Sequence, residues 1–224
     1  MPERPSSASA ATPFDPADIG LTHGSAMWVL RELGFSEGAS DITFNYYIKS
    51  LRKLGIPFSP GQNRHWFGRL ARYSFDHLME LALALTLRVY GAVPDAVLEG
   101  IIAHRAELNA IYRRAFNNRD RVVEAHFRGR GHAADVVLHG IYLDLRIAFS
   151  GGQLVSFGPP RTLAPDEAIR SLSGEFLTSR ASLPIHISHL AGRIVVLAAG
   201  APAIRRGPTS SITGRPRLQS RYSR

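Results

Sequence analysis

The spacing of apolar residues changes once along this chain of 224 residues. Up to about Phe116, apolar residues recur three and four positions apart, the period of amphipathic helices. Beyond about Val122, apolar and polar residues alternate between glycine-containing turns, which is the period of half-buried strands. The pattern therefore predicts an α+β protein with a helical N-terminal part and a small C-terminal α+β module of antiparallel strands.

Glycine and proline residues divide the helical part into four predicted helices, over residues 25–33, 42–54, 74–90 and 94–116. Asp41 or Thr43 can cap the second helix. Its predicted buried stripe consists of Phe44, Tyr47, Ile48, Leu51 and Leu54. Adjacent residues point about 100° apart, so only one of the two neighbouring tyrosines belongs to the core. We assign Tyr47 to the core and Tyr46 to the surface.

The C-terminal half contains a clear hairpin pattern. Residues 142–157, YLDLRIAFSGGQLVSF, alternate on both sides of a Ser-Gly-Gly turn. A short helix is predicted near 166–172. A further strand pair, PIHIS and RIVVLA, is predicted within residues 183–197, around Ala191 and Gly192.

The composition of the two ends differs from that of the middle. Residues 1–24 are rich in Ser, Ala and Pro and predict a disordered leader, whereas residues 201–224 predict a disordered basic tail. Between them we expect a helical domain over 25–92, a connecting or dimerisation helix over 93–121 and the α+β module over 122–200.

The formal charge of +9 is unevenly distributed. Six arginines and no acid lie in residues 201–224, so the tail accounts for +6 of this charge. Within the folded part, residues 49–72 contain six cations and no Asp or Glu, namely Lys49, Arg52, Lys53, Arg64, Arg69 and Arg72. Such a window favours a polyanion partner, although it is also compatible with an ordinary solvated helix face.

Several classes of protein are disfavoured. The chain has no cysteine, which excludes disulfides, thiolate metal sites and a cysteine nucleophile. His186 and His189 are three apart in a predicted strand and would face opposite sides, so we interpret them as solvated or core residues, as we do His126, His132 and His139. No phosphate-binding loop, nucleophile elbow or zinc-protease motif is present, so we expect no enzyme, no catalytic residue, no cofactor and no metal.

The N-terminal segment lacks a basic region followed by an apolar run, and no stretch approaches the roughly 20 apolar residues that span a bilayer. We therefore expect a cytoplasmic, nucleoid-associated protein without a membrane partner.

Several short motifs occur in order along the helical half. TFNYY begins at Thr43, LGIP at Leu54, RYSFDHL at Arg72 and VLEGI at Val97. This order, over residues 25–103, resembles the DNA-binding domain of MerR-type transcription regulators. The resemblance implies a winged helix-turn-helix in residues 25–92, with helix 42–54 in the major groove and loop 59–72 as the wing.

The residues and the resemblance together suggest a set of DNA contacts. Asn45 and Lys49, one turn apart, are placed to contact base edges, while Arg52, Lys53 and the loop arginines are placed to contact phosphates. The resemblance implies that Asn45 and Tyr46 or Tyr47 contact DNA and that Arg64, Arg69 and Arg72 hold phosphates. Thr43, at the start of the motif, completes the set.

The chain departs from the family pattern at four points. Asn45 replaces the usual arginine, which favours adenine over guanine as the base contacted. The wing reads GRLARY from Gly68 rather than containing a Gly-Tyr-Arg triplet, and residues 36–41 lengthen the turn between the first two helices. The long dimerisation helix of the family has only a shorter candidate here, which ends near Phe116.

The leading hypothesis is therefore a sequence-specific, homodimeric regulator bound to double-stranded DNA. A second hypothesis is an architectural or accessory DNA-binding protein, such as a recombination directionality or partition factor. A weaker third is an enzyme housed in residues 122–200, a region that could also bind an effector, a protein or its own copy.

Overall fold

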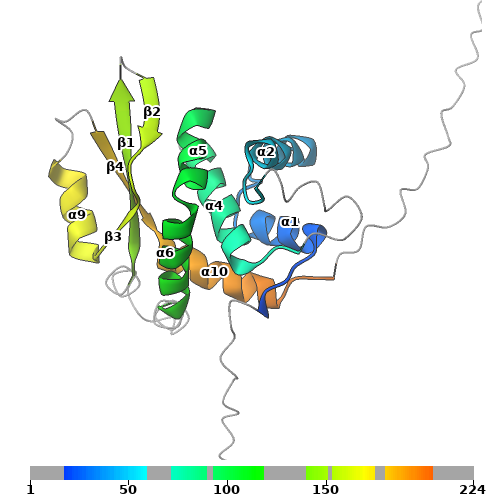
Figure 1. Cartoon of the computed structure of the whole chain (residues 1–224). Coiled ribbons are helices and arrows are strands. Elements are labelled where there is room, and N and C mark those ends of the chain that lie inside the picture. The colour runs from blue at the N-terminus through cyan, green and yellow to red at the C-terminus, as the bar shows by residue number, and fades with distance from the viewer. Residues whose placement is uncertain are drawn as a thin grey trace, which may run out of the picture.

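The computed structural model describes residues 18–59, 72–89, 93–118, 140–150, 153–174 and 180–203. Five helices precede the sheet within these ranges, namely α1 (His23–Glu32), α2 (Asp41–Leu54), α4 (Phe75–Val89), α5 (Asp95–Ala103) and α6 (Arg105–Asn117). They are followed by β1 (Tyr142–Ser150), β2 (Gln153–Phe157), β3 (Arg161–Leu163), α9 (Pro165–Gly174), β4 (Arg180–His186) and α10 (Ile187–Ala199). The α+β class is confirmed (Figure 1).

The sheet is built around β1, and all its pairings are antiparallel. One edge of β1 pairs with β4 from Tyr142 to Ala148. The other edge is shared, with β3 along its first three residues and β2 along its last four. The four strands therefore form a sheet that is three strands wide, and the hairpin predicted over residues 142–157 is confirmed as β1 and β2.

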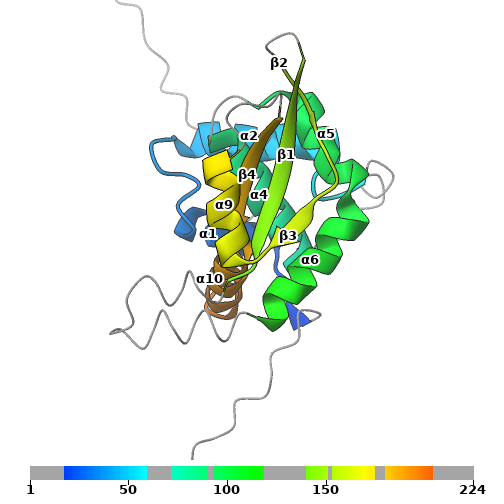
Figure 2. The ribbon, with the colours of Figure 1, turned by 90° about the vertical axis from the view of Figure 1, so that its left-hand side faces the viewer.

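Helices cover both faces of this sheet. Helix α9, which confirms the helix predicted near residues 166–172, contacts β1, β3 and β4 on one face, while α5 and α10 contact the sheet from the other face (Figures 1 and 2). Helix α4 lies next to α5 and α6, and α1 and α2 lie beyond α4, on the side away from the sheet (Figure 1). This arrangement places α2 at an edge of the molecule.

One hydrophobic core joins the two halves of the chain. Leu143 and Leu145 of β1, together with Ile187 and Ile194 of α10, belong to the same buried cluster as side chains of α1, α2, α4, α5 and α6. Polar contacts add to this packing, since Arg193 of α10 donates a hydrogen bond to the Glu32 carbonyl at 3.1 Å. The residues on either side of the predicted boundary at 122 therefore share a core.

The second half of the strand pair predicted within residues 183–197 is wrong. PIHIS begins in β4, but RIVVLA belongs to α10. The residues of α10 that are buried include Ile187, Ala191, Ile194 and Ala198, which recur at helical spacing. The run Ile194-Val195-Val196 has high β-propensity, and packing of one helical face against the core overrides that preference.

The helix predicted over residues 94–116 is divided at His104 into α5 and α6. The two apolar faces, represented by Val97 and Ile101 of α5 and by Leu108 and Tyr112 of α6, are buried within this chain. Because these faces are already covered, this segment connects parts of the core, and its apolar stripes are not available as a dimerisation surface.

Described structure begins earlier and ends later along the chain than expected. Ile19 is buried, and Leu21 forms paired backbone hydrogen bonds with Tyr73 at 2.8 and 3.0 Å. Thr22 caps α1, so a disordered leader that extends to residue 24 is wrong for residues 18–24. Ser25 donates a hydrogen bond to the Pro202 carbonyl at 2.8 Å, which orders the first residues of the predicted tail. Residues 1–17 and 204–224 lie outside the described residues.

Because both halves share one core, a cavity created in α10 should also destabilise the N-terminal half. Ile194→Ala removes a fully buried side chain and should lower the free energy of unfolding by about 2–5 kcal/mol. The matched variant Val196→Ala, at a position that is 45% exposed, should change it by at most about 0.5 kcal/mol. In Ile194→Ala, the midpoint of urea unfolding should shift by the same amount whether unfolding is followed by circular dichroism or by tryptophan fluorescence. Separate transitions for the two signals would contradict a single core.

Candidate nucleic-acid interface

Helix α2 has defined signals at both ends. It begins after Ser40, whose hydroxyl accepts a hydrogen bond from the Thr43 amide at 3.2 Å. Ser40 is therefore the N-cap, and the expectation that Asp41 or Thr43 caps the helix is wrong. Gly55 ends the helix with φ of 97°, a left-handed conformation that favours glycine.

The inner face of α2 is narrower than predicted. Phe44, Ile48 and Leu51 are buried as expected, and Leu54 packs against the core with partial burial. Tyr47 is 41% exposed, so its assignment to the core is wrong. At about 100° per residue, Tyr47 lies at the margin of the stripe formed by Phe44, Ile48 and Leu51, where the side chain reaches solvent.

The opposite face of α2 is open to solvent. Ile42, Tyr46, Lys49 and Lys53 are exposed and lie within an arc of about 60° around the outward direction, which we call the outer ridge. Asn45, also exposed, flanks this ridge, and Arg52 beside it is half-buried. The structure therefore exposes Asn45, Tyr46, Lys49 and Lys53 among the predicted contact residues of α2, whereas Arg52 and Thr43 are half-buried. The Thr43 hydroxyl lies 2.9 Å from the Ser40 hydroxyl, with which it forms a hydrogen bond.

Arg31 fixes α2 against α1. Its guanidinium group pairs with the Asp41 carboxylate at 3.1 Å and lies over the Phe44 ring, 5.3 Å from the ring centroid. Asp41 is the only acid in α2, and Arg31 compensates its charge. Lys49, Arg52 and Lys53 form no ion pair within the described ranges, so the cationic half of the outer ridge is not neutralised by a carboxylate.

Arg105, the first residue of α6, holds the C-terminal end of α2. Its guanidinium group donates two hydrogen bonds to Glu80 Oε1 and one to Oε2, at 2.6–3.2 Å. It also donates to the Gly55 carbonyl at 2.6 Å and to the Ser59 hydroxyl at 2.8 Å. Glu80 is 2% exposed, and burial raises the pKa of its carboxyl while Arg105 opposes this shift.

The two ends of the segment predicted as the wing lie together. Residues 60–71 lie outside the described residues, so Ser59 and Arg72 are the described residues on either side of this gap. The Phe58 and Tyr73 rings meet edge to face with centroids 5.1 Å apart. The Phe58 ring also meets the His77 ring edge to face, with centroids 4.6 Å apart. Tyr73 is anchored further by its hydrogen bond to His23 at 3.0 Å. Arg72 is exposed beside this anchor, whereas Arg64 and Arg69 lie outside the described residues.

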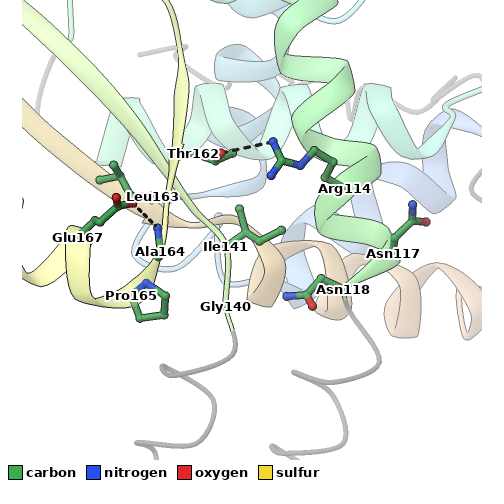
Figure 3. Close-up of a pocket in the computed structure, with 10 residues that line it drawn as sticks. All are labelled: Arg114, Asn117, Asn118, Gly140, Ile141, Thr162, Leu163, Ala164, Pro165 and Glu167. Atoms are coloured by element: carbon green, nitrogen blue, oxygen red, sulfur yellow. Dashed lines mark hydrogen bonds between the residues drawn. The ribbon is translucent and has the colours of Figure 1, made fainter.

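A shallow pocket of about 690 Å³ lies between the end of α6, the start of β1, β3 and the start of α9, and no residue of α2 lines it (Figure 3). Arg114 donates to the Thr162 hydroxyl at 3.5 Å, and the Glu167 carboxylate accepts from the Ala164 amide at 3.0 Å. Glu167 is the one carboxylate among the ten lining residues, and none of them is a histidine. The pocket therefore presents no pair of groups suited to acid–base catalysis.

His186 and His189 do not face opposite sides, and this expectation is wrong because β4 ends at His186 and α10 begins at Ile187. The His186 ring stacks with the Tyr142 ring and with the His189 ring, at centroid distances of 4.6 and 5.7 Å. It also lies against Gly140, where a Cβ atom would come within 1.9 Å of His186 Nε2. Burial, and secondarily His189, lowers the pKa of His186 to about 4. Among the described residues, no group of three or more His, Asp or Glu side chains is arranged to hold a metal ion.

The sequence pattern does not reveal Arg105, Glu80 or Ile42 as important residues. Glu80 interrupts the otherwise apolar stretch LMELALAL, and such an isolated acid is a signal for a buried cationic partner. Nothing local identifies that partner as Arg105, which is 25 residues away. Ile42 falls within a predicted helix, but its 82% exposure is evident only once the inner and outer faces of that helix are known.

Comparisons with protein-family models, with curated proteins and with solved structures found no match to this chain. None of the helices in the described ranges is both long and apolar enough to cross a bilayer.

The Arg105 contacts predict a large stability effect. Arg105→Ala leaves the Glu80 carboxylate buried without its partner and should lower the free energy of unfolding by about 3–5 kcal/mol. Arg113→Ala breaks the longer pair, at 3.7 Å, between an exposed arginine and the half-buried Asp76, and it should cost at most about 1 kcal/mol. Chemical denaturation of both variants measures the difference, and equal costs would show that the Arg105 contacts contribute no more than a surface ion pair.

The His186 environment predicts a pH effect. An unfolded histidine binds a proton near its ordinary pKa of 6.5, while the folded His186 does so only near 4. The unfolded state therefore binds more protons in this interval, and this contribution to stability is lost as the pH falls from about 6.5 to about 4. Unfolding titrations across this pH range should show that the free energy of unfolding falls less in His186→Phe than in the parent protein. Identical pH slopes would refute the assignment.

Proposed function

We propose that this protein is a sequence-specific DNA-binding transcription regulator of the MerR-like type. The supporting observation is the outer ridge of α2, which is solvent-exposed and carries Lys49 and Lys53, neither of which pairs with a carboxylate of a described residue. A helix with these properties fits the major groove of B-DNA, where polar side chains reach base edges and cations meet the flanking phosphates. Asn45 and Lys49 contact bases in this proposal, while Arg52 and Lys53 contact phosphates.

The anchoring of Phe58, Ser59 and Tyr73 supports a wing beside α2. Arg105 joins Ser59 to the end of α2, and the Phe58–Tyr73 contact joins both ends of the intervening segment. The pairing of Leu21 with Tyr73 then fixes this base to the start of α1. A loop attached at this point can contact the phosphate backbone adjacent to the groove that α2 enters, with Arg72 at its base and Arg64 and Arg69 within it.

We further propose that the protein binds DNA as a homodimer, because two copies related by a twofold axis would read the two halves of a near-palindromic site. The dimer surface must lie outside the apolar faces of α5 and α6, since these faces are buried within one chain. A DNA-binding dimer of this kind would be associated with the nucleoid.

Removal of two cations from α2 tests the proposal. Lys49→Ala combined with Arg52→Ala should weaken binding to a selected duplex by roughly ten- to a hundredfold, because charge-assisted hydrogen bonds to the DNA are removed. The dependence of log K on log salt concentration should become shallower by about one unit for each phosphate that the variant no longer binds.

The matched control removes the same charge from another side of the molecule. Arg114→Ala combined with Arg170→Ala alters α6 and α9, and it should leave both the affinity and the salt slope near those of the parent. Fluorescence anisotropy titrations from low to high salt measure all three proteins. Equal affinities for the parent and the α2 variant at every salt concentration would place the DNA contact elsewhere.

A further inference from the structure

Ile42 is the most exposed large apolar side chain among the described residues, at 82%. It lies on the outer ridge next to Tyr46, which is 66% exposed, and one turn of helix before it. An isoleucine at the start of a solvent-facing ridge gains nothing from burial in this chain, whereas Phe44 and Ile48 show that the same helix has a separate inner face for packing.

The neighbours of Ile42 indicate what it contacts. Asn45 lies three residues on, so the two Cβ atoms are about 5–6 Å apart, which corresponds to one or two base-pair steps at about 3.4 Å each. Asparagine can form two hydrogen bonds with adenine in the major groove, and the apolar feature of that groove is the 5-methyl group of thymine. A branched aliphatic group beside an amide therefore matches adenine and thymine in neighbouring positions.

A second protein copy fits this surface less well. The ridge continues into Lys49 and Lys53, and the cores of protein interfaces are depleted in lysine. Both cations would be buried by a protein seated over Ile42 and Tyr46, whereas a DNA duplex places phosphates beside the same groove that exposes the thymine methyl group.

Resting on the proposed function, we infer that Ile42 is a specificity-determining residue that reads a thymine methyl group, while Asn45 reads an adenine in a neighbouring base pair. The binding site of this protein then contains A·T pairs at the position where the start of α2 enters the major groove. Because the contact is with the methyl group, the affinity for DNA should fall when that methyl group is removed, even though base pairing is unchanged.

Deoxyuridine provides this change, because it differs from thymidine only by the missing methyl group. Duplexes are first selected from a random pool with the full chain, and each thymine of the enriched motif is then replaced singly by uracil. At one position per half-site the parent protein should bind about fourfold more weakly, as expected for one buried methyl group. With Ile42→Ala the ratio of affinities for the thymine and uracil duplexes should fall to about one at that position.

Asn45→Ala serves as the matched comparison. It should keep the fourfold preference for thymine over uracil but lose discrimination between adenine and 7-deazaadenine at the neighbouring pair, because 7-deazaadenine lacks the N7 acceptor. This pattern separates the contact made by Ile42 from a general loss of α2 structure.

The outcomes separate the two proposals. If no duplex is enriched from the pool, the proposed function is overturned together with this inference. If duplexes are enriched but the motif lacks thymine, or if Ile42→Ala keeps the preference for thymine over uracil, only the inference is overturned. A change of oligomeric state in Ile42→Ala, detected by sedimentation, with that preference unaltered would instead assign Ile42 to a contact between copies.

Discussion

The guanidinium group of Arg105 is the contact on which the position of α2 depends. It binds both carboxylate oxygens of Glu80 in α4, the Gly55 carbonyl at the end of α2 and the Ser59 hydroxyl at the start of the next segment. Compared with apolar packing, a buried charge pair of this kind adds little net stability, yet removal of one partner is costly because the other charge is left buried. The planar guanidinium group also holds its acceptors in a defined geometry. One side chain thus fixes the end of the proposed recognition helix and the base of the proposed wing relative to the core.

The other end of α2 is held by different forces. Arg31 pairs with Asp41 and covers the Phe44 ring, so α1 and the first turn of α2 are joined by charge and by aromatic contact. Between these two ends, Phe44, Ile48 and Leu51 enter a core that extends through α4 to β1 and α10. Because the inner face is packed in this core, the orientation of the outer ridge is set by the fold, and a defined orientation favours selective contact with a groove.

Local periodicity is sufficient to predict α1, α2, α4, the β1–β2 hairpin and the exposed cations Lys49 and Lys53, because each depends on residues close in sequence. It fails where tertiary packing decides the outcome. Ile194, Val195 and Val196 favour a strand, yet they lie in α10 because one side of that helix completes the core. His104 separates α5 from α6 and directly precedes Arg105, which contacts Glu80. No residue near either position in the sequence indicates that Glu80 and Arg105 are partners. Ser40 is not distinguished as the cap from sequence because Asp41 and Thr43 are equally suitable residue types.

The absence of cysteine from the chain permits the most direct test of the central claim, that the outer side of α2 contacts duplex DNA. A single cysteine introduced as Ser50→Cys on α2, or as Ile169→Cys on α9, can carry a DNA-cleaving iron chelate. Placement of α2 in the major groove predicts cleavage at one position per half-site of the selected duplex from Ser50→Cys and none above background from Ile169→Cys. Equal cleavage from both positions, or cleavage from Ile169→Cys alone, would contradict this placement.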